Sequence, residues 1–283
     1  MTTHMARTLM AMILATGVAT LGFQPLRAQQ PATASAADSQ PSPNYDAEAE
    51  RRLLEMTNRE RANAGLAPLQ VDDGLVKAAR AHAAAMAAQG KLSHQLSGEP
   101  NLVQRLAANS KTHLDQSGEN VAFAGSVDQA QSSLMHSPPH RANLLNAGYN
   151  VAGFSVVRSG SLLYVAQDFG HSLPSYSARE ADDIVAASVD RIRVQSRLPA
   201  LQLMDGREAA SAACAMAKSD SLHSPPLRGR EILRYTTSQP QLLPTNASRA
   251  IENPSVRAFA VGSCYARSAS YPTGVYWVAL LFY

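Results

Sequence analysis

The stretch HSPPHRANLL, residues 136–145, places a histidine and an arginine at the expected start of a helix. Proline is tolerated in a first helical turn, because the N–H that it lacks would have no partner there. Ser137 is therefore predicted to be the N-cap, with His140 and Arg141 at the helix start. An imidazole can transfer protons or bind a metal, and a guanidinium fits a carboxylate.

Other catalytic signatures are missing from the sequence. It contains no HExxH pair, no glycine-rich phosphate loop and no nucleotide fingerprint. The first cysteine is residue 214, which excludes a Cys–His enzyme from the earlier part of the chain. Ser93 and Ser137 stand beside histidines, but adjacency in sequence does not aim a base at a hydroxyl. No catalytic residue is assigned from the sequence.

The start of the chain has the pattern of a secretory signal. Arg7 precedes an apolar run from Leu9 to Phe23, and Ala28 is a suitable cleavage position, so residues 1–28 are predicted to be a signal peptide. A membrane anchor is the alternative, but the run is short and interrupted by Thr and Gly. No later segment is apolar enough to span a bilayer. We therefore expect a secreted or periplasmic protein without a stable membrane span after cleavage.

A segment rich in Pro, Ala and Ser, residues 29–44, is predicted to be a disordered linker. The whole chain has 25 basic and 22 acidic residues. A nucleic-acid partner needs a strongly basic surface, so this near balance argues against one. Cys214 and Cys264 are the two cysteines, and in an exported protein they favour a disulfide, although sequence alone does not bring them together.

Four helices and a strand pair are expected in the first part of the chain. The predicted helices cover residues 46–64, 73–89, 102–108 and 127–135, and the strands cover 151–157 and 162–169. Asp72 or Asp73 caps the second helix, and Gly90 ends it. His82 lies on the apolar stripe of that helix, so it is predicted to be a core histidine.

The later part of the chain repeats this pattern. NRERANAGLAPLQVDDGLVKAARAHAAAMA has an echo in DRIRVQSRLPALQLMDGREAASAACAMAKS, and KLSH has one in DSLH. An internal duplication explains these matches, with units at residues 45–172 and 178–283. Chance similarity of two α+β stretches is the alternative. The second copy is shorter and lacks the middle section.

Five motifs in order carry a family resemblance: LLEMTNRERANAGLAPL, KAARAHAAAMAAQGKLSH, GENVA, SPPHRANLL and YVAQDFG. With them the first unit resembles the CAP superfamily (SCP/TAPS), which includes cysteine-rich secretory, antigen 5 and plant pathogenesis-related proteins, and most of all its bacterial branch. The resemblance implies an α+β fold, an α-β-α sandwich with a cleft. The second unit is then a degenerate CAP-like α+β copy, with an unrelated partner-binding or dimerisation domain as the alternative.

The resemblance also implies site residues. In many members the cleft holds two His and two Glu that bind a divalent metal, and His94 and Glu119 match the first of each. Ser137 and Tyr164 stand at the other two positions, so half of that set is missing. In the bacterial pattern His140 is a cleft residue instead. His94, Glu119 and His140 are therefore the candidate ligands for a Zn²⁺-type ion with one open position.

A purely structural reading of the same residues stays open. Glu119 would tie a GEN turn to the sheet, and His94 would donate to it. Arg141 would pair with Asp168 or Glu119, and Asn120 would satisfy a loop backbone. Gln167 and Asp168 are neighbours on a strand, so only one of them can face the cleft.

Three functions follow from these expectations. The leading one is a binding module whose cleft residues (His94, Glu119, Asn120, Ser137, His140 and Arg141) hold a small apolar molecule, a lipid or a peptide. Lipid binding is known for some members, so that part is an implication of the resemblance. The second is a metal-dependent extracytoplasmic hydrolase using His94, Glu119 and His140. The third is a scaffold without a ligand. The sequence indicates no oligomeric state.

Overall fold

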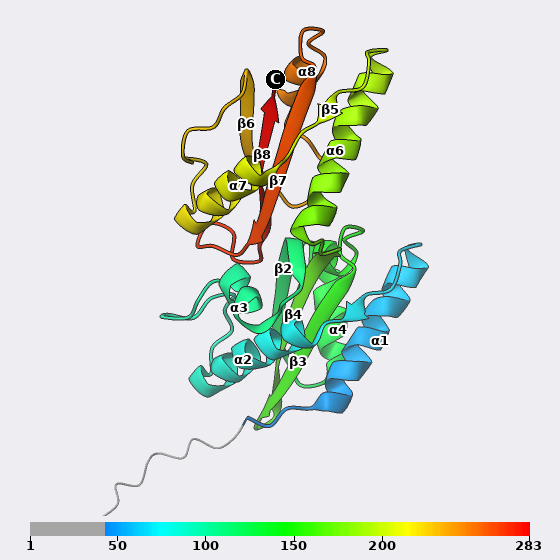
Figure 1. Cartoon of the computed structure of the whole chain (residues 1–283). Coiled ribbons are helices and arrows are strands. Elements are labelled where there is room, and N and C mark those ends of the chain that lie inside the picture. Colours follow the sequence, from blue (N-terminus) through cyan, green and yellow to red (C-terminus); the bar gives the residue numbers. More distant parts are fainter. Residues whose placement is uncertain (1–42) are drawn as a thin grey trace, which may run out of the picture. The chain divides into compact units, whose positions relative to one another are not determined.

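The computed structural model describes residues 43–283. The predicted signal peptide and all but the last two residues of the predicted linker lie outside this range. Residues 43–283 form one compact unit that contains two four-stranded sheets (Figure 1). Within the described residues, no helix combines the length and the apolar character that a membrane crossing requires.

The first sheet is built from residues 70–173 and has the strand order β1-β3-β4-β2. Its strands are β1 (Gln70–Val71), β2 (His113–Ala124), β3 (Val151–Ser159) and β4 (Leu162–Leu173). The helices around it are α1 (Ala47–Asn63), α2 (Asp73–Gln89), α3 (Leu102–Asn109), α4 (Val127–His136) and α5 (Pro138–Leu144). Strand β1 runs parallel to β3, and the other pairs are antiparallel.

Helices cover both faces of this sheet. Helix α2 packs on one face, where Ala83 and Met86 meet Val121 and Ala166. Helices α1 and α4 pack on the other face, α1 against β3 and α4 against β2, around a core that includes Phe154. The α-β-α sandwich expected for the first unit is therefore confirmed (Figure 1).

The helix ends follow local signals. The Asp72 side chain accepts a hydrogen bond from the Leu75 N–H, and Gly90 ends α2 in the left-handed region at φ 60°. Pro138 begins α5, as the sequence predicts, and Ser137 occupies the N-cap position. The Ser137 hydroxyl makes no capping hydrogen bond, so the prolines rather than the serine set the start of this helix.

Strand β2 is the element that the sequence analysis missed. The GEN motif is not a turn: Glu119 and Asn120 lie inside β2, opposite Asp168 and Gln167 of β4. The segment HLDQSGENVAFA contains polar residues and a glycine, which strands disfavour. Long pairing with β4 overrides this local preference, and the prediction that Asn120 satisfies a loop backbone was wrong.

The second sheet, from residues 202–282, has the same architecture. Its order is β5-β7-β8-β6, again with one parallel pair at the β5 edge. The strands are β5 (Gln202–Leu203), β6 (Glu231–Thr237), β7 (Ala258–Ala266) and β8 (Val275–Phe282). The helices are α6 (Ala178–Gln195), α7 (Arg207–Ser219) and α8 (Ala247–Ile251). This shared topology supports the duplication, in which β5 to β8 repeat the order of β1 to β4.

A buried arginine marks the first helix of each unit. Arg61 of α1 is 1% exposed and donates to the carbonyls of Ala67, Leu144, Asn146 and Tyr149. Arg193 of α6 is 2% exposed and donates to the carbonyls of Pro199, Ile251 and Asn253. In both cases Nε bonds the carbonyl six residues further along the chain. Each guanidinium satisfies loop carbonyls that lie far apart in sequence.

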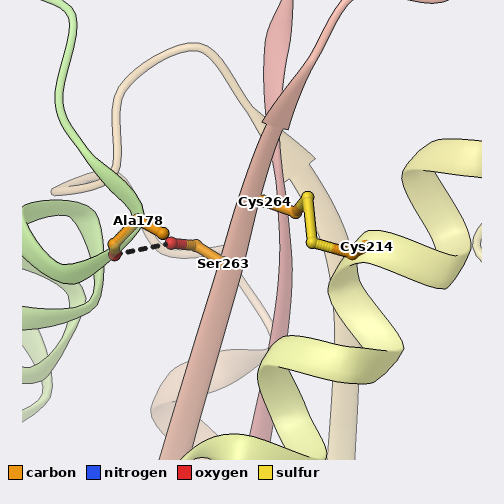
Figure 2. The surroundings of a disulfide bond; sticks show 4 residues. All are labelled: Ala178, Cys214, Ser263 and Cys264. Atoms are coloured by element: carbon orange, nitrogen blue, oxygen red, sulfur yellow. Dashed lines mark hydrogen bonds between the residues drawn. A yellow bond between two sulfur atoms is a disulfide. The ribbon is translucent and has the colours of Figure 1, made fainter.

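The disulfide belongs to the second unit. Cys214 of α7 is bonded to Cys264 of β7, as the paired cysteines favoured. Figure 2 shows that Cys264 and its neighbour Ser263 leave the strand on opposite sides. Ser263 donates to the carbonyl of Ala178 at the start of α6. Strand β7 is therefore tied covalently to α7 and by a hydrogen bond to α6.

Candidate functional site

Three separate elements bring the predicted site residues together. His94 lies in the loop after α2, Glu119 on β2 and His140 on α5. The His94 Nδ1–H donates to Glu119 Oε1 over 2.9 Å, and the ring centroids of His94 and His140 are 6.3 Å apart. The side chain of Glu119 is only 4% exposed, whereas that of His94 is 59% exposed. The two imidazoles therefore lie above a buried carboxylate.

Beneath the imidazoles lies a buried ionic cluster. Arg105 of α3 donates to Glu119 Oε2 and lies 3.7 Å from a carboxylate oxygen of Glu99. The two ring nitrogens of His82 face the Glu99 carboxylate at 2.7 Å and the Ser93 carbonyl at 2.9 Å. Both of these partners are hydrogen-bond acceptors. Arg105 lies between the carboxylates of Glu119 and Glu99, and such pairing is what buried charges require.

A third carboxyl group, that of Asp168, completes the cluster. Asp168 lies directly across from Glu119 and is fully buried. Among the described residues, nothing forms a hydrogen bond to either of its carboxyl oxygens. Burial raises the pKa of Asp168 well above its ordinary value, the negative charge of Glu119 raises it further, and Arg105 opposes the shift. Asp168 therefore keeps its proton where an exposed aspartate would have lost it.

The other face of the same strands holds an amide network. Asn120 donates to the His140 carbonyl and to Gln167 Oε1, both over 3.1 Å. Asn143 of α5 donates to Asn120 Oδ1 over 2.9 Å. These contacts fasten α5 to β2, so Asn120 positions His140. Gln167 faces Asn120 while Asp168 faces the cluster, which confirms that the two neighbours point to opposite faces.

Two expected pairings are corrected by the structure. Arg141 is exposed and has no ion pair among the residues that the structure describes, so it serves neither Asp168 nor Glu119. Arg105 takes that place, because α3 lies against α2 and carries it to Glu119. His82 is fully buried as predicted, although it is held by Glu99 and Ser93 instead of by apolar contacts.

Arg105 and Glu99 were missed by the sequence analysis. Arg105 is 5% exposed, yet it stands in LVQRLAAN, where arginine resembles a solvent-facing helix residue. No local signal in this helix of eight residues marks Arg105 as buried, because its burial depends on packing against other elements. Glu99 had no such signal either, because its partners come from α2, α3 and the loop between them.

The donor set fits a metal ion only in part. No group of three His, Cys, Asp or Glu side chains suited to an ion is found within residues 43–283. Both oxygens of Glu119 are engaged, one by His94 and one by Arg105. A carboxylate on Nδ1 is, however, the usual way to orient a histidine whose Nε2 binds a metal. Burial and the neighbouring His94 lower the pKa of His140, which favours its neutral, metal-binding form. Glu119 is thus a positioning group, with His94 and His140 as the available ligands.

Comparison with known proteins matches the first unit to a family. Residues 54–169 match the model of the CAP family, described as the cysteine-rich secretory protein family. The curated relatives include two proteins of Bacillus subtilis. The uncharacterized protein YkwD is 34% identical over 137 residues, which are 47% of this chain and 52% of YkwD. The uncharacterized membrane protein YlbC is 33% identical over 124 residues, which are 42% of this chain and 34% of YlbC. The chain thus spans about half of YkwD and a third of YlbC.

Two solved structures are also similar to part of this chain. An extracellular SCP-domain protein of Bacillus anthracis is 25% identical, with a TM-score of 0.40, over 44% of this chain and 41% of that one. An outer surface protein of Borrelia burgdorferi is 19% identical, with a TM-score of 0.43, over 46% of this chain and 99% of that one. The first unit therefore contains a region, residues 54–169, that is similar to the CAP domain of the cysteine-rich secretory protein family, and the first unit is called the CAP domain below. The family match ends at residue 169, so the second unit lies outside it.

Proposed function

We propose that the CAP domain is an extracytoplasmic binding module whose ligand contacts His94 and His140. One observation carries this proposal: the polar groups beneath the imidazoles already contact one another, through the Arg105–Glu119 ion pair and the His82–Glu99 hydrogen bond. The groups left for a ligand are the two rings. The nearby Ser93 hydroxyl donates to the Gln95 carbonyl, so it is not placed as a nucleophile.

The ligand class follows from what an imidazole offers. Each ring presents one hydrogen-bonding nitrogen and a flat apolar face. A peptide carbonyl or the head of a small lipid supplies the matching polar group beside an apolar body. A small apolar molecule, a lipid or a peptide is therefore the proposed ligand. The amide network of Asn120 supports binding by holding α5, and hence His140, at a fixed distance from the sheet.

An exported location supports this assignment. The Cys214–Cys264 disulfide suits an oxidising compartment, and the first 28 residues have the pattern of a secretory signal. We propose that the protein acts in the periplasm or outside the cell.

The test is analysis of the ligand that the protein carries. The full chain is purified from an exporting bacterium beside the variants His94→Ala and His140→Ala, and bound lipids and peptides are identified by mass spectrometry after extraction. His136→Ala is the matched control, because exposed His136 contacts only its own helix. We expect a bound species that is lost in both variants and kept in the control. A well-folded wild type whose bound species do not depend on either histidine contradicts the proposal.

A metal-dependent hydrolase is the second candidate. It is favoured by the Glu119 contact at His94 Nδ1, which leaves Nε2 free beside His140. A bound Zn²⁺ would polarise a substrate bond or activate water. Zinc titration by calorimetry tests this candidate: one saturable site that is lost in His94→Ala and in His140→Ala supports it. Absence of zinc binding rules it out. A third outcome is that the wild type binds neither metal nor ligand and that both variants are less stable. This outcome would favour a scaffold in which the two histidines are purely structural.

A further inference from the structure

We propose that the second unit contains a binding site for an anionic group, a carboxylate or a phosphate, in a pocket centred on Arg234. The pocket has a volume of about 430 Å³. It is lined by His223, by residues 232–235 of β6 and by Asn246, with apolar Leu222 and Pro244 completing its wall. We call it the β6 pocket. It is independent of the function proposed for the CAP domain.

The two sheets can be aligned through one glycine in each. A Cβ on Gly153 would collide with the backbone of Leu75 and Val76 in α2. A Cβ on Gly262 would collide in the same way with the backbone of Ala209 and Ala210 in α7. Leu75 and Ala209 are each the third residue after their helix N-cap. The two glycines are therefore equivalent positions in the duplicated fold.

The strand register then places Arg234 where the CAP domain has Glu119. Gly153 pairs with Asp168, which pairs with Glu119. Gly262 pairs with Ala279, which pairs with Arg234. The carboxylate of the first site is thus replaced by a guanidinium, and the buried Asp168 by an alanine.

The histidine of the first site is kept in the second. His94 follows α2 by a short loop and contacts Glu119, and His223 follows α7 by a short loop and lines a pocket together with Arg234. His223 Nδ1 lies 2.8 Å from the Ser221 hydroxyl. The equivalent location therefore combines an imidazole with a cation instead of with an anion.

Arg234 has no anionic partner. In the part of the chain that the structure describes, no Asp or Glu lies within ion-pair distance of it, and its Nε donates to the Ser224 hydroxyl over 2.8 Å. The remaining N–H groups of its planar fork match a carboxylate or a phosphate. Between residues 218 and 249 there are five Lys or Arg and only two acidic residues. Both acidic groups have partners: Asp220 accepts from Ser268 and Ser270, and Glu231 pairs with Arg249.

The neighbouring Tyr235 does not belong to this group of donors. Successive side chains on a strand point to opposite faces, and Tyr235 packs in the core with Leu233 and Ala247. The donors available to a bound anion are therefore those of Arg234 and His223.

The experiment is a titration of the full chain with inorganic phosphate and, separately, with acetate, followed by NMR or calorimetry at constant ionic strength. The variant is Arg234→Gln. Its control is Arg249→Gln, which removes the same charge from an exposed side chain of α8. Tyr235→Phe removes a hydroxyl from the opposite face of β6 and is a second control. Circular dichroism verifies that each variant is folded.

We expect saturable binding of at least one anion by the wild type, weakened about tenfold or more in Arg234→Gln and less than about twofold in Arg249→Gln. Tyr235→Phe should leave the affinity unchanged. Tighter binding of phosphate indicates a phosphorylated ligand, and tighter binding of acetate a carboxylate ligand. Absence of saturable binding, or equal affinity in wild type and folded Arg234→Gln, overturns the proposal.

Discussion

The two units have sheets of the same strand order, but the equivalent faces of these sheets carry different side chains. Where α2 meets the first sheet, His82, Glu119 and Asp168 belong to a buried ionic cluster. In the second unit the positions of Asp168 and Glu119 hold Ala279 and Arg234, and α7 packs through alanines and Met216. A sheet of the same strand order thus folds without the cluster. The fold therefore does not require these buried charges, and in the first unit one of them, Glu119, contacts His94.

The units also differ in how a helix is secured to the sheet. In the second unit, a covalent bond joins α7 to β7. In the first unit, which has no cysteine, Arg80 of α2 instead pairs with Glu50 of α1, and the Glu50 carboxylate also reaches the backbone of β3. The comparison predicts that a reducing agent lowers the stability of the second unit, which contains the disulfide. It also predicts that loss of the Arg80–Glu50 ion pair lowers the stability of the first unit.

The largest effect is expected from the arginine that each unit buries. Arg61→Ala should lower the free energy of unfolding by about 3–5 kcal/mol, because four carbonyls lose a charged donor inside the protein. Arg193→Ala should cost somewhat less, because three carbonyls are affected. Urea denaturation of the full chain measures both. Exposed Arg141→Ala is the control and should change stability by less than about 0.5 kcal/mol. A loss under about 1 kcal/mol for Arg61→Ala would contradict this role.

Removal of the disulfide should affect only the second unit. The bridge closes a loop across 50 residues, and the double variant Cys214→Ala/Cys264→Ala should lose about 2–4 kcal/mol. Hydrogen exchange read by mass spectrometry locates the change. We expect faster exchange in β7 and α7 and unchanged exchange in β3 and α2. Equal acceleration in both units would show that they unfold together and would remove the contrast.

Glu119 and Arg234 carry opposite charges at equivalent positions, and replacing each of them gives a sharper comparison of the two units. Glu119→Gln leaves Arg105 without its buried partner and should cost about 2 kcal/mol. Arg234→Gln at the equivalent position breaks no ion pair and should cost less than about 0.5 kcal/mol. Thermal unfolding of the two variants tests the difference. Equal losses would mean that Arg234 supports the fold rather than a ligand.

The smallest effect, about 1 kcal/mol, is expected from Asp168→Asn, and it is stabilising at neutral pH. The folded-state pKa of Asp168 is raised above its ordinary value of 3.8, so the native state keeps a proton that the unfolded chain releases. The free energy of unfolding therefore falls as the pH rises from about 4 through the folded-state pKa. The variant lacks this decline. Melting temperatures measured from about pH 4 to 8 for both proteins test it, and parallel curves would contradict it.

Local signals explain which parts of the fold were predictable. Asp72 and Gly90 mark the ends of α2, and Pro138 marks the start of α5, because caps and prolines act on their own helix. Gln167 and Asp168 were placed on opposite faces because strands alternate. Strand β2 was missed because its pairing with β4, and not its composition, makes it a strand. The identity of the Glu119 partner depended on a helix packing contact that no local pattern encodes.

The last strand of each unit lies inside its sheet, β4 between β3 and β2 and β8 between β7 and β6. Synthesis delivers a chain from its N-terminus, so the first sheet can close once residue 173 has emerged. The second sheet has to wait for residue 282. Until then β6 and β7 have no shared neighbour, and Cys214 emerges 50 residues before Cys264. The topology therefore allows the first unit to fold before the second, and Cys214 stays without its disulfide partner until Cys264 has emerged.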